Sequence, residues 1–332
     1  MPASCLVKMS NIAKKTTNYI NAVCKSNEQK LLGAERLNRM AEASSLEEAF
    51  AILRENNFFG GEISCSASEF SSLIANEQKR LNQFLLEYAP NDECKIFCLS
   101  SLDFYNAEVL VKCEFNKLDQ SKFIGLEGLY TLQQLKDELL KGNGNFPKEL
   151  VGAVNESKNA LENGFGGMTV GGIFSKALYA YLLRVIHTDY LKQIIKKEID
   201  LLNLSIALRC EDEQTANSLY ISGSLSMECF SALIKRDESA VNSLIAPYLR
   251  DLAIKCIRLC KEGKPLIELE RKLSSIGADR MIVERYTELS GSNPFILYYY
   301  RRKNEIICAR MVLTGKQNGL DPDQIKRRMV SV

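Results

Sequence analysis

Histidine and tryptophan are nearly missing from this chain of 332 residues, which has one histidine, His187, and no tryptophan. Catalysis by a histidine dyad and a metal site built from several histidines therefore lack the side chains that they need. Proline is scarce too, with seven residues, so long stretches are free of the residue that most often interrupts helices. These absences argue against an enzyme and favour a helical protein.

Positive and negative charges are nearly balanced, since the chain has 43 Lys and Arg residues and 41 Asp and Glu residues, for a net charge of +2. A nucleic-acid-binding protein usually carries a broad positive field, so no nucleic-acid partner is predicted. No apolar stretch of about eighteen residues occurs, and the amino terminus lacks the apolar core of a signal peptide. We therefore expect neither a membrane span nor secretion.

Eleven cysteines are present, an odd number at irregular spacings. The closest pairs, Cys94 with Cys98 and Cys256 with Cys260, are one helical turn apart, whereas zinc ribbons and redox motifs place two residues between their thiols. The pattern predicts a reducing compartment, no metal site, and thiols that act as small buried hydrophobic groups.

The glycine-rich segment from Gly164 to Gly172 is the first place to look for a phosphate-binding loop. It lacks the Gly-Lys-Ser/Thr sequence of a P-loop, and a helical pattern precedes it where a dinucleotide-binding fold needs a strand. We predict a flexible connection here and no nucleotide or other cofactor. His187 is expected to be an ordinary surface or capping residue.

Helical periodicity runs through most of the chain, so the predicted fold class is all-α. Ser45 is expected to start a new helix after a short break, and Asp321 and Pro322 to begin the last one. The run Ile96–Leu99 is the only segment that resembles a strand. The helical ranges are 33–57 as a pair, 69–88, 129–141, 174–209, 226–235, 245–261, 266–289, 293–314 and 322–329.

A faint triplication links three segments that begin about 100 residues apart, an ordinary domain length. An acid is followed three positions later by an Asn in Asp103 with Asn106 and in Asp200 with Asn203, while the third copy begins at Glu305. The Asp200 segment is apolar on nearly every side, which predicts a central, buried helix. A buried carboxylate and amide must find partners, so these pairs either fasten one helical unit to another or line a binding cavity.

The carboxyl-terminal region is basic, with eight Lys and Arg against three Asp and Glu from residue 294 onward. A solvated helix face explains this composition, and a docking surface for an acidic partner or an anionic membrane is the alternative.

Several motifs in this order resemble the C subunit of the V-type and archaeal-type rotary ATPases and ATP synthases, which is called the d subunit in eukaryotes. The similarity spans nearly the whole chain, from the opening helices at residues 34–59 through both Asp/Asn pairs. It is strongest in Asn293-Pro294-Phe295 to Tyr298, in Glu305 five residues before Arg310, and in Gly319-Leu320-Asp321-Pro322 to Ile325. Cys308 and Thr314 depart from the pattern in the third copy.

The resemblance implies three similar helical units, at residues 1–118, 119–215 and 216–332, arranged as a funnel with pseudo-threefold symmetry. Such a protein is a non-catalytic socket, peripheral at the cytoplasmic face of the membrane. It connects the central shaft subunits to the membrane proteolipid ring and couples ATP hydrolysis or synthesis to proton or sodium transport. The signature positions that would support the socket or bind a partner are Asp103, Asn106, Asp200, Asn203, Glu305 and Arg310.

Two other functions stay open at this point. A soluble helical-repeat adaptor would bind protein partners with the same architecture. A helical enzyme would use Asp103 and Asp200 as paired carboxylates, which requires that the two side chains converge in one cleft.

Overall fold

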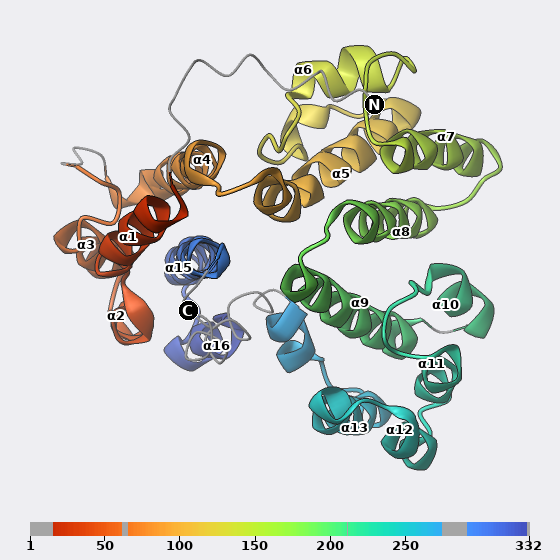
Figure 1. Ribbon diagram of the computed structural model, residues 1–332. Helices are drawn as coiled ribbons and strands as arrows, with labels where there is room; N and C mark the ends of the chain where they lie inside the picture. The colour runs from red at the N-terminus through yellow and green to blue at the C-terminus, as the bar shows by residue number, and fades with distance from the viewer. Residues whose placement is uncertain (1–15, 62–65, 211, 274–290, 331–332) are drawn as a thin grey trace. The chain divides into compact units, whose positions relative to one another are not determined.

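The computed structural model describes residues 16–61, 66–210, 212–273 and 291–330, and within these ranges every regular element is a helix. No strand occurs in the described ranges, and the segment Ile96–Leu99 lies inside the helix α5 (Asp92–Asn116) (Figure 1). The predicted all-α class is therefore confirmed. Contacts divide the chain into two compact units, one of residues 92–265 and the other of residues 14–91 with 266–332.

The unit of residues 92–265 is built on four long helices, α5, α7 (Lys148–Glu162), α8 (Gly167–Val185) and α9 (Asp189–Arg209). The antiparallel neighbours α7 and α8 make its most extensive contact, and α5 packs against both. Their shared core includes Phe104, Leu110, Leu150 and Phe174, all at most 2% exposed.

Short helices complete this unit. Between α5 and α7 the chain forms a 3₁₀ turn (Gln120–Lys122), α6 (Leu132–Gln134) and a π-helical turn (Leu135–Leu139). After α9 come α10 (Glu213–Leu219), α11 (Met227–Ile234), α12 (Glu238–Leu244) and α13 (Pro247–Lys261). Both α11 and α13 pack on α9, which places α9 among helices on several sides.

The predicted helix over 174–209 is interrupted, because α8 ends at Val185 and α9 begins at Asp189. The carboxylate of Glu93 on α5 stabilises the segment between the two helices. It accepts hydrogen bonds from the backbone N–H groups of His187 (3.0 Å) and Thr188 (3.1 Å) and from the Thr188 hydroxyl (2.6 Å). These bonds lower the pKa of Glu93 against the effect of its burial, which is the larger single influence. His187 itself is exposed, as predicted.

The interpretation of Gly164–Gly172 as one flexible connection is wrong for its second half. Gly164, with φ of +82°, ends α7, but residues from Gly167 onward are the first turns of α8. A Cβ atom at Gly172 would lie 2.1 Å from a methyl carbon of Leu219 on α10. The glycine there permits close contact between two helices, which the sequence pattern alone does not distinguish from a loop.

The other unit surrounds α15 (Asn293–Gln317) with α1 (Thr17–Glu28), α2 (Gly33–Glu42), α3 (Leu46–Glu55) and α4 (Phe70–Tyr88). A 3₁₀ turn (Ala67–Glu69) precedes α4, and α16 (Pro322–Arg328) packs on α2 and α15. Both predicted caps are present, since Ser45 accepts from the Glu48 N–H and Asp321 from the Asp323 N–H.

Most of the cysteines behave as small buried hydrophobic residues, as predicted. Among the described residues two, Cys210 and Cys260, are half-buried; the buried ones are Cys24, Cys94, Cys98, Cys113, Cys229, Cys256 and Cys308. Most of the predicted helix over 266–289 lies outside the described residues.

Candidate functional site

The first Asp/Asn pair is buried on α5 and binds the backbone of the loop that leads to α6. Asp103 is 1% exposed, and its two carboxylate oxygens accept from the N–H groups of Leu129 (3.0 Å) and Tyr130 (3.1 Å). Asn106 is fully buried; its amide accepts from the Gly125 N–H and donates to the Leu126 carbonyl. The pair thus satisfies four backbone groups of one loop.

Burial raises the pKa of Asp103 to about 7, whereas the two N–H donors act in the opposite direction by favouring the carboxylate. Gly128 lies directly against this side chain, and a Cβ atom there would be 2.5 Å from an Asp103 oxygen. The loop can approach the carboxylate this closely only because position 128 has no side chain.

The second pair repeats this arrangement on α9. Asp200 is 2% exposed and accepts from the N–H groups of Ser224 and Leu225, both at 2.8 Å. Its other oxygen accepts from the hydroxyl of Tyr248 at 2.5 Å. Asn203, fully buried, bonds both the N–H and the carbonyl of Ile221.

The two loops correspond position by position from the glycine to the N-cap of the helix that follows. Gly223 lies against Asp200 as Gly128 does against Asp103, since its Cβ atom would be 2.7 Å from an Asp200 oxygen. The residues that follow the bonded N–H groups, Thr131 and Ser226, are the N-caps of α6 and α11. In both copies a buried carboxylate therefore fixes the start of the helix that follows the bound loop.

At the third position Glu305 on α15 is 1% exposed, and one of its oxygens accepts from the Gly33 N–H at 2.8 Å. Its other oxygen accepts from Arg302, at 3.3 Å. Burial raises the pKa of Glu305, and these two donors oppose that effect. The carboxylate again binds the start of another helix in its own unit, here α2.

Arg302 joins Glu305 to α4, and we call Glu77, Arg302 and Glu305 the Arg302 cluster. The guanidinium donates to Glu77 at 2.7 Å and to the Phe58 carbonyl at 2.6 Å, and it lies 4.0 Å from the centre of the Phe58 ring. All three charged residues of the cluster are at most 9% exposed. One buried cation thus serves two buried carboxylates from different helices.

The remaining predicted positions lie elsewhere. Arg310 is exposed on α15, and the basic partner of Glu305 is Arg302, one turn earlier. Cys308, at the place of the Asn, is buried and its thiol faces the Val330 carbonyl at 3.4 Å. Thr314 is exposed. The contacts among the described residues give Arg310 no role inside the chain.

Sequence reasoning missed the residues that complete these sites, namely Glu77, Gly128, Gly223, Tyr248 and Arg302. Arg302 carried a usable signal, because residues three apart on a helix are neighbours and Glu305 needs a cation. The two glycines occupy like places before Thr131 and Ser226, and an aligned comparison of the copies would have shown them. No feature of the sequence marked Glu77 or Tyr248, because their contacts depend on the tertiary fold.

These sites offer little room for a ligand and do not bring their carboxylates together. A cavity of about 20 Å³ lies beside Asp200 and Tyr248, room for about one water molecule. Asp103 and Asp200 each bind their own loop rather than a shared cleft. No group of three metal-binding side chains occurs in the part of the chain that the structure describes. The arrangement can fasten helices together, and no described feature of it positions a substrate.

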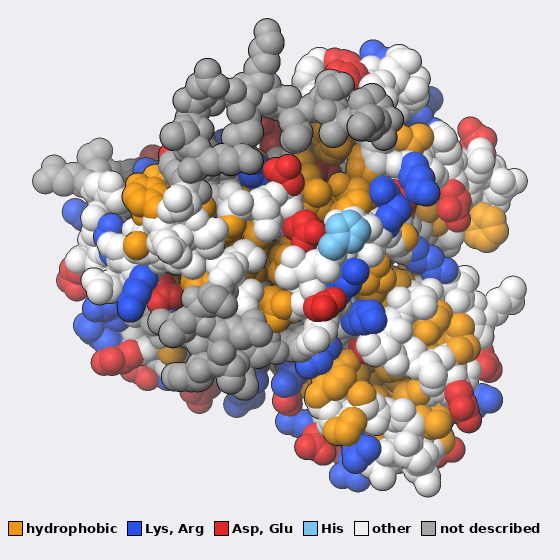
Figure 2. Space-filling model, in the orientation of Figure 1, with side chains coloured by type: hydrophobic (Ala, Val, Ile, Leu, Met, Phe, Trp, Pro, Cys, Tyr) orange, Lys and Arg blue, Asp and Glu red, His pale blue; other side chains and the backbone are white. Residues whose placement is uncertain are grey.

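Surface charge and helix hydrophobicity bear on which partners the chain could bind. Lys and Arg side chains are interspersed with Asp and Glu over the face seen in Figure 2, so no broad field of one sign covers it. Among the described helices, none has the length and apolar character that a bilayer crossing demands.

Comparison with known proteins gives consistent matches over nearly the full length. The model of the ATP synthase (C/AC39) subunit family matches residues 20–328. The C subunit of the V-type sodium ATPase of Enterococcus hirae is 20% identical over 323 residues, a similarity that covers 94% of this chain and 98% of that protein.

Proposed function

Because the chain belongs to the ATP synthase (C/AC39) subunit family, which includes the C subunits of V-type ATPases, we propose that it is the central-stalk socket of a rotary ATPase. In this role it receives the foot of the central shaft and rests on the membrane proteolipid ring. It lies peripherally at the cytoplasmic face of the membrane and transmits torque without catalysing a reaction.

The observation that carries this proposal is the pair of matching contacts at Asp103 and Asp200. A part that transmits torque must keep its helices fixed relative to one another under load. Each buried carboxylate ties a long helix to a loop that starts a short helix, α6 for Asp103 and α11 for Asp200, by bonds to two backbone N–H groups. Bonds of a charged group to buried donors are among the stronger ones in proteins.

From the family resemblance we also propose three similar units, at residues 1–118, 119–215 and 216–332, arranged about a pseudo-threefold axis. With these boundaries Asp103 binds the loop of the second unit, Asp200 that of the third, and Glu305 binds Gly33 of the first. The three signature positions would then fasten each unit to the next in a closed cycle. Arg310, which is exposed, is the signature position suited to a partner contact.

The proposal is tested by reconstitution of the ATPase from its own organism with and without this chain. We expect the soluble sector to hydrolyse ATP in both preparations, and ion pumping into vesicles to require the chain. The purified chain should have no ATPase activity and should bind the shaft subunits.

Normal pumping in the absence of the chain would refute the socket role. If the chain instead co-purified with soluble clients and not with ATPase subunits, it would be a helical-repeat adaptor. A proton gradient and a sodium gradient measured in the same vesicles would identify the coupling ion.

A further inference from the structure

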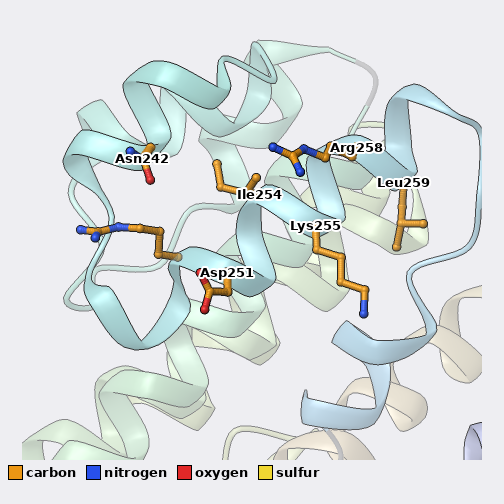
Figure 3. Close-up of a pocket in the computed structure, with 7 residues that line it drawn as sticks. Asn242, Asp251, Ile254, Lys255, Arg258 and Leu259 are labelled. Atoms are coloured by element: carbon orange, nitrogen blue, oxygen red, sulfur yellow. The ribbon is translucent and has the colours of Figure 1, made fainter.

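A cleft of about 420 Å³ lies on the surface of α13, where Asn242 of α12 forms part of its lining (Figure 3). This volume is within the range of sites that hold a ligand or a few side chains of a partner. The cleft lies wholly within the unit of residues 92–265 and shares no residue with the signature positions. Its lining on α13 includes Arg250, Asp251, Ile254, Lys255 and Arg258.

The lining carries an excess of positive charge, with three basic side chains and one carboxylate. Arg258 donates a hydrogen bond through Nε to Glu238 at 3.0 Å, and Lys261 donates one to the same carboxylate at 3.1 Å. Glu238 is therefore paired with two cations. The Nε atom of Arg250 is buried and has no hydrogen-bond partner among the described residues. A buried donor without a partner is costly, so an acceptor that reached this atom would gain a hydrogen bond without displacing one inside the chain.

The spacing of these groups limits the kind of ligand. Arg250, Ile254 and Arg258 follow one another at intervals of four residues and so form one stripe of α13. At 1.5 Å per residue, the two arginines are anchored about 12 Å apart with an apolar side chain between them. Two separate acidic groups on an elongated ligand match this stripe better than one small anion does.

We propose that this cleft binds an acidic amphipathic helix of a partner protein, with a carboxylate at each end of an apolar contact. A helix with acids eight residues apart and an aliphatic residue midway presents the complementary stripe. Carboxylates suit the planar donor groups of arginine, and the aliphatic residue would cover Ile254. The choice of a protein as ligand rests on the proposed function, since a socket works by binding other subunits.

The test uses the full chain and a fluorescent, alanine-based helical probe peptide with Glu, Leu and Glu at intervals of four residues. We expect the probe to bind, and the double variant Arg250→Gln with Arg258→Gln to weaken binding at least tenfold. The double variant Arg327→Gln with Arg328→Gln removes the same charge from the exposed face of α16 and should change binding less than twofold. Circular dichroism melts check that both variants fold.

A second measurement needs no variant. A spin label on the probe should broaden the methyl resonance of Ile254 in the unaltered chain. The proposal is overturned by absence of binding, by equal binding of a peptide with its two Glu on opposite faces, or by equal losses in the two double variants. It is also overturned if pyrophosphate displaces the probe and KCl of equal ionic strength does not, since the cleft would then hold small oxyanions.

This assay contains no other ATPase component. Failure of the probe to bind would therefore refute the acidic-helix site and leave the socket role to the pumping experiment. Normal pumping without the chain would refute the socket role and leave the acidic-helix site to the probe assay.

Discussion

Replacement of Asp200 by Ala tests whether the buried carboxylates hold the loops in place. The side chain accepts three hydrogen bonds, two from the backbone N–H groups of Ser224 and Leu225 and one from the Tyr248 hydroxyl. Tyr248 is 45% exposed, so its hydroxyl can turn to water, but the Leu225 N–H is buried and the Ser224 N–H partly so. Two stranded donors at about 1–3 kcal/mol each predict a loss of about 2–6 kcal/mol in the free energy of unfolding.

The loss is measured by urea denaturation followed by circular dichroism, and hydrogen exchange locates it. In Asp200→Ala the amides of Ser224 and Leu225 should lose protection, while those of α7 should keep theirs. Asp251→Ala makes the same change on an exposed position of α13 and should cost less than about 0.5 kcal/mol. Equal and negligible losses in both variants, with unchanged protection at 224 and 225, would refute the reasoning.

Three further predictions concern the first pair and the Arg302 cluster. Gly128→Ala should destabilise the chain by about 1–3 kcal/mol, because the new methyl group would meet Asp103; Gly152→Ala, where a Cβ atom has nothing within 4 Å, should not, and urea melts compare them. Because burial raises the pKa of Asp103 to about 7, the folded chain holds an extra proton between about pH 4 and pH 7, so its stability should fall over that range. Asp103→Asn should flatten that slope in melts at stepped pH, and an unchanged slope would contradict the assignment. Arg302→Met should cost about 3–5 kcal/mol, because Glu305 would lose its buried cation and Glu77 would keep only the more exposed Arg80, whereas Arg310→Met on the exposed face should be nearly neutral in the same melts.

The sequence allowed the helical class and the burial of α9 to be predicted, because both depend on residue types at regular intervals. A helix that is apolar on nearly every side must lie among other helices, and Asp200 and Asn203 on it must find partners. The identity of most of those partners was not predictable, because apart from the Tyr248 hydroxyl the donors are backbone N–H groups of Ile221, Ser224 and Leu225. Every residue but proline has such a group, so no residue type marks the loop as the partner.

Two errors have the same physical origin. The connection over Gly164–Gly172 and the continuous helix over 174–209 were both judged from local pattern, but tertiary contacts decided them. A side chain at position 172 would meet Leu219, which explains a glycine inside α8, and the helix breaks near His187 because Glu93 binds the N–H groups that the break leaves unpaired. Neither Leu219 nor Glu93 is close to these segments in sequence.

The third position shows how a changed copy can keep the same contact by other means. Cys308 cannot make the two backbone bonds that Asn106 and Asn203 make, so the amide contribution is lost there. Glu305 has a longer side chain than Asp and reaches the first N–H of α2, where the helix dipole favours a negative charge. Arg302 adds the ionic bond that replaces the missing amide bonds. The contact at Glu305 therefore depends on charge where the other two depend on backbone geometry, so loss of the arginine should be more damaging there than loss of Cys308.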